Sequence, residues 1–202
     1  MRVRLTRSSR SAGPVVQSAS RDGAHTTRAA VYYRFSSQAQ AERFIAGPAF
    51  ADAKARLLGQ GTVSLAIWQV LVPNDMEALF KRGPVFETGV DLVLALQPPS
   101  GQAPPPDVVV EVVGRLQRAA LAATSVQVSC GVDVLSVEAT YMWMARFSEE
   151  GSAQRFLRSP VVLELAAAQK AAGQDSVPAA PLSLVSMVLI EVGSVEQSKQ
   201  RL

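Results

Sequence analysis

The chain has 202 residues, of which 48% are hydrophobic and 18% are charged, so it has enough apolar material for a core and cannot be a disordered polyelectrolyte. Its one cysteine and one histidine exclude an internal disulfide and any site that needs two imidazoles from one chain, such as a histidine-rich zinc site. The formal net charge is +3, but the first 30 residues hold six arginines and one acidic residue, so the rest of the chain is net negative and we expect no nucleic-acid binding.

Residues 1–14 form a basic arm, rich in arginine and serine, that we expect to be disordered. The same composition is typical of an organelle transit peptide, in this case a plastid one. The alternative interpretation is that these residues are an irregular N-terminal end of the first domain. The apolar runs are shorter than the ~20 residues of a membrane-spanning helix. We therefore expect an intracellular soluble protein, cytoplasmic by default, although the C-terminal Gln200-Arg201-Leu202 distantly resembles a peroxisomal Ser-Lys-Leu address.

Residues 15–72 predict a first module of strands around a broken helix. Strands are expected at 15–20 and 30–35, where β-branched and aromatic residues are frequent. A helix over 37–58 is interrupted at Pro48, because proline lacks the backbone donor that a helix needs. A closing strand over 63–72 and a linker over 73–86 complete this part of the chain.

Residues 87–193 predict a complete second module, followed by a tail over 194–202. The expected elements are a strand at 87–96, a helix at 107–123, strands at 125–135 and 138–147, a helix at 148–172 broken by Pro160, and a strand at 182–192. Asp107 and Ser148 are the expected N-caps of the two helices. The order β-α-β-β-α-β is that of a ferredoxin-like fold, with an antiparallel sheet and both helices on one face.

An internal repeat relates the two modules. The motifs Arg-Phe-Ser, Ala-x-Arg-Phe and a following proline occur at 34–48 and again at 146–160, always with an offset of 112 residues. The first copy lacks room for an opening strand and helix, because few residues precede Val15. We favour a truncated chain start as the explanation. The alternative is that a partner protein covers the apolar surface that the incomplete first module leaves exposed.

These motifs resemble the stress-responsive A/B barrel (Dabb) domain in its tandem plant and algal form. The resemblance rests on a third strand that ends in phenylalanine, a helix containing Phe-Ile/Leu-x-x-Pro, and a closing aliphatic strand, and it covers 15–72 and 87–192. It implies an α+β protein in which two ferredoxin-like modules pack sheet to sheet as a pseudo-dimeric α/β barrel, with the first module N-terminally incomplete. Members of the family are described as stress-induced proteins, and a polyketide cyclase is the best-understood enzymatic relative.

The histidines that the family uses for catalysis are absent from the matching positions. The family often has His-Pro-Ala-His in the broken helix, where this chain has Gly-Pro-Ala-Phe at 47–50 and Ser-Pro-Val-Val at 159–162. A Thr-His step that commonly begins the third strand is Arg28-Ala29 in one copy and Thr140-Tyr141 in the other. Without an imidazole that titrates near neutral pH, we expect no catalysis of the cyclase type.

The sequence also predicts no cofactor and no metal, because it has no glycine-rich phosphate loop and no metal-ligand spacing.

Two further side chains are interpreted as chemically inert. His25 is expected in a solvated turn with only Asp22 near it in sequence, and Cys130 is expected to be a buried thiol among valines, with no cation to lower its pKa.

The third strands carry the candidate ligand-binding residues. Alternate strand residues face opposite ways, so one set packs under the helices and the other lines the space between the sheets. The candidates for a flat apolar ligand are Tyr33, Tyr141, Trp143 and Arg146. The alternative is that the aromatic residues only fill the core and that Arg146, like Arg34, is solvated or pairs with Glu42, Glu149 or Glu150.

The sequence thus favours a non-catalytic stress-related protein with a small apolar ligand between two sheets. One alternative is an enzyme on the same barrel, either cyclase-like or a cofactor-free monooxygenase. Another is an oligomerisation module that self-associates through the incomplete first module.

Overall fold

The structure is a computed structural model that describes residues 10–20, 29–33, 35, 37–58, 66–68, 89–99, 103–134, 139–171 and 181–192. The predictions for His25, Arg34, the linker at 73–86 and the tail at 194–202 lie outside these residues. The described part confirms the α+β class: five helices accompany a six-stranded sheet with the order β2-β1-β6-β3-β5-β4.

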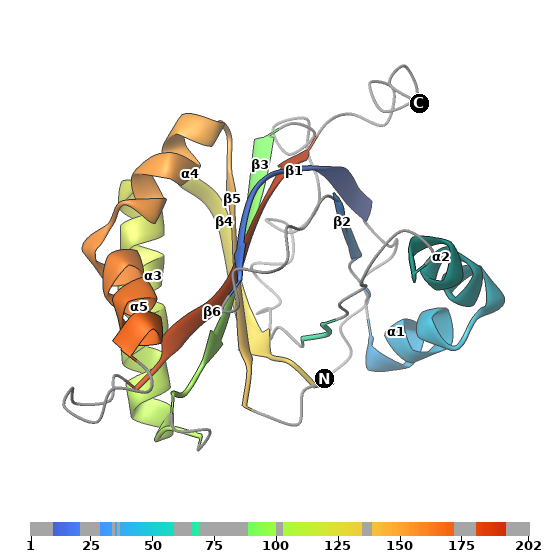
Figure 1. Ribbon diagram of the computed structural model, residues 1–202, viewed down its shortest axis with the longest axis horizontal. Coiled ribbons are helices and arrows are strands. Elements are labelled where there is room, and N and C mark those ends of the chain that lie inside the picture. Colours follow the sequence, from blue (N-terminus) through green and yellow to red (C-terminus); the bar gives the residue numbers. More distant parts are fainter. Residues whose placement is uncertain are drawn as a thin grey trace.

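The described part of the C-terminal half contains four strands and three helices. They are β3 (Gly89–Gln97), α3 (Pro106–Ala122), β4 (Ser125–Val132), β5 (Tyr141–Phe147), α4 (Glu150–Leu157), α5 (Pro160–Ala171) and β6 (Ser183–Val192). The four strands pair antiparallel in the order β6-β3-β5-β4, which is consistent with the expected ferredoxin-like unit. Figure 1 shows α3, α4 and α5 together on one face of this sheet.

The two helix starts differ from the expectation by one or two residues. The N-cap of α3 is Pro105, with Pro106 and Asp107 already in the first turn. A proline at the first helical position loses no hydrogen bond, since that backbone donor is unpaired in any helix, and Asp107 still lies near the positive end of the helix dipole. Similarly, Glu149 rather than Ser148 is the N-cap of α4, with no side-chain capping hydrogen bond.

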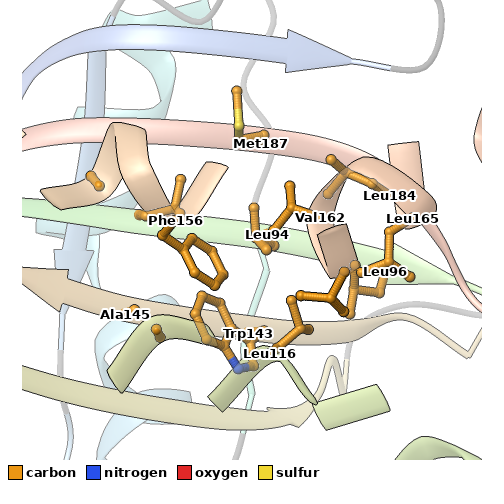
Figure 2. Close-up of a cluster of buried hydrophobic side chains, with 14 of the residues drawn as sticks. Leu94, Leu96, Leu116, Trp143, Ala145, Phe156, Val162, Leu165, Leu184 and Met187 are labelled. Atoms are coloured by element: carbon orange, nitrogen blue, oxygen red, sulfur yellow. The ribbon is translucent and has the colours of Figure 1, made fainter. Parts of the chain in front are cut away.

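The core lies between this sheet and its helices. Leu92, Leu94 and Leu96 alternate along β3 and are completely buried under the helices. The rings of Trp143 on β5 and Phe156 on α4 stack with centroids 5.0 Å apart (Figure 2). Each large apolar side chain buried in this way contributes about 1.5–3 kcal/mol to folding, so this layer supplies most of the stability of the C-terminal half.

The N-terminal half contributes β1 (Arg10–Ser20), β2 (Ala29–Tyr33), α1 (Gln38–Ile45) and α2 (Pro48–Leu58). Strand β1 begins at Arg10, so the end of the arm predicted to be disordered lies in a strand. Residues 10–14 pair with β2, and residues 15–20 pair with β6. In Figure 1, β2, α1 and α2 lie on the side of the main sheet opposite α3, α4 and α5.

A second connection joins the two halves at the other edge of the sheet. Trp68 forms an antiparallel bridge with Asp133, just beyond β4. The backbone N–H of Val134 donates to the carbonyl of Ile67 at 2.8 Å, and the Asp133 carboxylate accepts the N–H of Ile67 at 3.0 Å. The N-terminal half is therefore attached to both edges of the four-stranded sheet, at β6 and at β4.

The offset of 112 residues also relates helices and strands of the two halves. Helices α1 and α2 have the same starts as α4 and α5 once 112 is added, and so do strands β2 and β5. The ring pair Phe35–Phe44, with centroids 5.2 Å apart, matches Phe147–Phe156 at 5.7 Å. This strand–helix–helix arrangement thus occurs twice. Two complete modules are not shown, because the described N-terminal residues include no counterpart of β3 and α3.

Candidate functional site

The candidate site lies on the face of the four-stranded sheet opposite α3, α4 and α5, here named the helix-free face (Figure 1). Successive strand residues alternate between faces, and cross-strand partners share a face. In β5, Trp143, Ala145 and Phe147 belong to the core under the helices, which places Met142, Met144 and Arg146 on the opposite side. The register adds these residues to the helix-free face: Asp91, Val93 and Ala95 of β3, Gln127, Ser129 and Gly131 of β4, and Ser186, Val188 and Ile190 of β6.

One end of this face holds a buried ion pair. Arg146 lies directly opposite Asp91 in the sheet, and its Nε and Nη2 donate to the two carboxylate oxygens of Asp91. The side chains are 3% and 1% exposed, so both charges have left water. This two-pronged geometry is the strongest form of an Arg–carboxylate pair, and it leaves the pair with no net charge.

The partner of Arg146 differs from the one expected. The carboxylates considered from the sequence were Glu42, Glu149 and Glu150, because two of them follow Arg146 closely in the chain. The observed partner, Asp91, comes from a neighbouring strand 55 residues away. The available signal was that Asp91 is the single charged residue in the apolar run 90–96, since a charge in a buried strand needs a partner.

Two polar side chains of β4 near the ion pair each have one buried atom without a hydrogen-bond partner in the described part of the chain. Gln127 is opposite Arg146, and Ser129 is opposite Met144. Gln127 Nε2 and Ser129 Oγ are both buried, and neither has a hydrogen-bond partner among the residues that the structure describes. Ser129 as a whole is only 7% exposed. A buried polar atom without a partner costs about 1–3 kcal/mol, so these two atoms require an explanation.

Apart from Ser129 and Ser186, the rest of the helix-free face is apolar. Met142 and Met144 are 6% and 1% exposed, and Val93, Ala95 and Val188 are half-buried beside them. Methionine side chains adapt their shape to irregular apolar surfaces. The face therefore has a polar end, made by Asp91, Arg146 and Gln127, that continues into an apolar stretch.

The structure does not bring the four predicted ligand-binding residues onto one surface. Tyr141 and Trp143 lie under the helices, where Tyr141 packs against the core and Trp143 stacks on Phe156. Arg146 lies on the opposite face. Tyr33 is the last residue of β2 and is paired with Arg10 of β1. Only Arg146 of the four is therefore placed on the helix-free face. The sequence analysis did not select Gln127 and Ser129 as site residues, because their positions have the pattern of ordinary polar residues in an alternating strand.

Cys130 has the properties expected of an inert thiol. It packs against the helix-side core, opposite Trp143. Burial raises the pKa of the Cys130 thiol from 9.0 to about 11, so that very little thiolate, the reactive form, exists at neutral pH.

The Cys130 thiol is therefore expected to react with 5,5′-dithiobis(2-nitrobenzoate) at pH 8 about 100-fold more slowly in the folded protein than in urea. The factor follows from a shift of two pKa units, and limited access slows the reaction further. Absorbance at 412 nm measures the rate, and Cys130→Ser, which leaves no thiol in the chain, provides the baseline. A folded-state rate within tenfold of the rate in urea would contradict the burial of this side chain.

Within the described ranges, no three His, Cys, Asp or Glu side chains are arranged to hold a metal ion. No helix in the described part of the chain has the length and apolar character needed to cross a membrane.

The comparisons with known proteins give little further information. The chain matches no protein-family model and no curated protein. Among solved structures it is similar to a protein from Fusobacterium nucleatum subsp. nucleatum named "Putative monooxygenase", with 11% identity and a TM-score of 0.46 over 91% of this chain and 75% of that chain. A similarity of this size does not transfer an activity between two proteins.

Proposed function

We propose that the chain is a non-catalytic binding protein of the stress-responsive A/B barrel type, with a small, mostly apolar ligand held between the helix-free face and the N-terminal half. The observation that carries the proposal is the pair of buried, unpartnered polar atoms, Gln127 Nε2 and Ser129 Oγ. Leaving both unpaired would cost about 1–3 kcal/mol each. A ligand that pairs with them removes that cost.

The attachment of the N-terminal half supports this location. It is joined to β6 through β1 and to the end of β4 through Ile67 and Trp68. Elements attached at both edges of a sheet can enclose the face between them, as the second sheet of a barrel does. The low exposure of Met144 and Asp91 means that other parts of the chain already cover this face, so a ligand would have to displace some of them.

The enzymatic alternatives have less support. A cyclase or a cofactor-free monooxygenase needs a group that exchanges protons near the working pH. The Cys130 thiol is shifted away from that range, to a pKa of about 11, and Arg146 and Asp91 are engaged with each other. A binding role requires no change in the protonation state of these residues.

Titration with the uncharged fluorescent probe N-phenyl-1-naphthylamine tests the proposal. We expect saturable binding to the wild-type chain and at least tenfold weaker binding to Ala95→Phe, because the added ring occupies the apolar part of the helix-free face. Val188→Met fills the same region with less strain and should weaken binding to a smaller extent. Ala122→Phe, at an exposed position of α3, is the control and should bind as the wild type does.

Circular dichroism of each variant establishes that it is folded before the comparison is made. The proposal is wrong if the wild-type chain shows no saturable fluorescence change, or if folded Ala95→Phe and Val188→Met both bind the probe with wild-type affinity.

A further inference from the structure

Helix α3 carries a second stripe of uncharged side chains, outside the core. The stripe that belongs to the core is formed by the buried Val112, Leu116 and Ala120. At 3.6 residues per turn, the second stripe lies about 130° around the helix from the first, and its members are Val110, Gly114, Gln117 and Leu121. Val110 and Leu121 are 70% and 58% exposed. This spacing, alternately four and three residues, is the one with which two helices pack side by side along their length.

The second stripe is on the outside of the molecule. Arg115, which pairs with Glu164, marks the side of α3 that faces α5, and the stripe lies on the other side of the helix. Figure 1 shows α3 on the side of the main sheet away from α1 and α2. On the flank away from α5, Val132 of the neighbouring strand β4 is 49% exposed. An apolar surface of this kind, formed from two adjacent elements, is typical of a contact with another protein.

Gly114, in the middle of the stripe, has no role within the part of the chain that the structure describes. A glycine inside a helix costs backbone entropy that an alanine would not. A Cβ atom added at Gly114 would meet only the end of the Arg118 side chain of the same helix, at an ordinary contact distance of 3.5 Å. A missing side chain on an exposed helix face does, however, let a second backbone approach closely.

The stripe is complementary to itself in the antiparallel orientation. A two-fold axis places residue i opposite residue j and also j opposite i. With the axis passing between residues 115 and 116, Val110 lies opposite Leu121 of the partner subunit. Gly114 then lies opposite Gln117 of the partner subunit, so that the smallest member of the stripe faces the longest one. A parallel pair would instead place glycine opposite glycine and leave a gap.

The charges beside the stripe favour the same orientation. Glu111 and Arg118 are both exposed and lie on one flank of the stripe, and neither has an ion-pair partner among the described residues. A two-fold axis perpendicular to the plane of the two helices keeps each flank on its own side of the contact. Glu111 therefore faces Arg118 of the partner subunit, and the symmetry produces this pair twice. Opposite charges at such flanking positions determine which helices pair and in which orientation.

We propose that the chain forms a symmetric dimer in which α3 packs antiparallel against α3 of a second copy. A helix of 17 residues is about 25 Å long. A side-by-side contact of that length, together with Val132, buries roughly 1,000 Å² over both copies, close to the lower limit for a specific interface. The dimer is therefore weak and forms at micromolar concentrations. It uses the opposite side of the main sheet from the proposed ligand and does not depend on ligand binding.

Sedimentation equilibrium of the full chain between about 1 and 300 µM tests the proposal. We expect the average mass to rise from the monomer value of 21.5 kDa towards twice that value. Leu121→Gln replaces an exposed apolar side chain in both copies at once and should weaken the dimer at least tenfold. Circular dichroism establishes that each variant is folded, which we expect because the substituted positions are exposed.

A charge exchange tests the antiparallel orientation. Arg118→Glu places two carboxylates opposite each other at both ends of the contact and should weaken the dimer about tenfold. Adding Glu111→Arg to the same chain restores opposite charges and should return the dissociation constant to within about threefold of the wild type. Lys54→Glu makes the same change of net charge at an exposed position of α2 and should leave the dimer unchanged.

Three results would overturn the proposal. The first is a mass that stays at the monomer value over the whole concentration range. The second is association of Leu121→Gln and Arg118→Glu that is as strong as that of the wild type, which would place the interface elsewhere, such as on the incomplete first module. The third is a Glu111→Arg/Arg118→Glu variant that associates no better than Arg118→Glu, which would exclude the antiparallel arrangement.

Discussion

Replacing Asp91 with alanine is expected to lower the free energy of unfolding by about 3–5 kcal/mol, which is the usual effect of removing one partner from a buried ion pair. The carboxylate is completely buried, and Arg146 opposite it is 3% exposed. Without Asp91, the Arg146 guanidinium would remain in the protein interior with its charge uncompensated. Urea unfolding followed by circular dichroism measures the loss as a lower transition midpoint.

The exposed pair between Arg115 of α3 and Glu164 of α5 is a matched control. Its side chains are 37% and 58% exposed, so water and salt screen the interaction and little desolvation accompanies it. Glu164→Ala is therefore expected to cost less than about 1 kcal/mol. A loss of similar size from Glu164→Ala and Asp91→Ala would mean that the Asp91–Arg146 pair is not buried in solution.

A double substitution separates the cost of an unpaired charge from the value of the pair. Asp91→Leu combined with Arg146→Met replaces both charges with apolar side chains, a change that is often neutral or stabilising. We expect the double variant to recover most of the stability that Asp91→Ala loses. If the double variant is as unstable as Asp91→Ala, the pair itself contributes specifically to the folded state, for example by fixing the register of β3 against β5.

The sequence was most informative about the C-terminal half, where local patterns agree with the packing. The apolar spacing in 107–123 predicted α3 to within a residue or two, and Pro160 marked the boundary between α4 and α5. Alternation along β5 predicted that successive residues face opposite sides of the sheet, but it did not indicate which side the helices cover, so Trp143 and Arg146 were assigned to one site although they lie on opposite faces. The helix boundaries depend on residues close together in the chain, which is why periodicity was sufficient for them.

The candidate site was harder to predict because it depends on which strands are neighbours. Nothing local to Arg146 indicates that β3 will lie beside β5, so carboxylates nearby in sequence were considered instead of Asp91. Gln127 and Ser129 alternate with valines in the way that solvent-facing residues of a half-exposed strand do. Their burial comes from the assembly of the whole chain and has no signature in β4 itself.

The two copies of the aromatic cluster provide a second stability prediction with a large effect. Phe156→Ala is expected to lower the free energy of unfolding by about 3–5 kcal/mol, since removing a completely buried ring leaves a cavity. Its ring contacts Trp143 at 5.0 Å and Phe147 at 5.7 Å between centroids. At the equivalent place in the first copy, Phe44 is half-buried between Phe35 and Phe50, so Phe44→Ala should cost only about 1–2 kcal/mol.

Urea unfolding of the two variants also tests whether both halves of the chain unfold together. The β1–β6 pairing and the bridge between Trp68 and Asp133 connect them through backbone hydrogen bonds. If these connections make one cooperative unit, both substitutions shift the same transition, Phe156→Ala by more. A shift with Phe156→Ala and none with Phe44→Ala would show that α1 and α2 unfold separately from the main sheet. The N-terminal half would then be too loosely attached to enclose a ligand, and the binding proposal would lose the second wall that it requires.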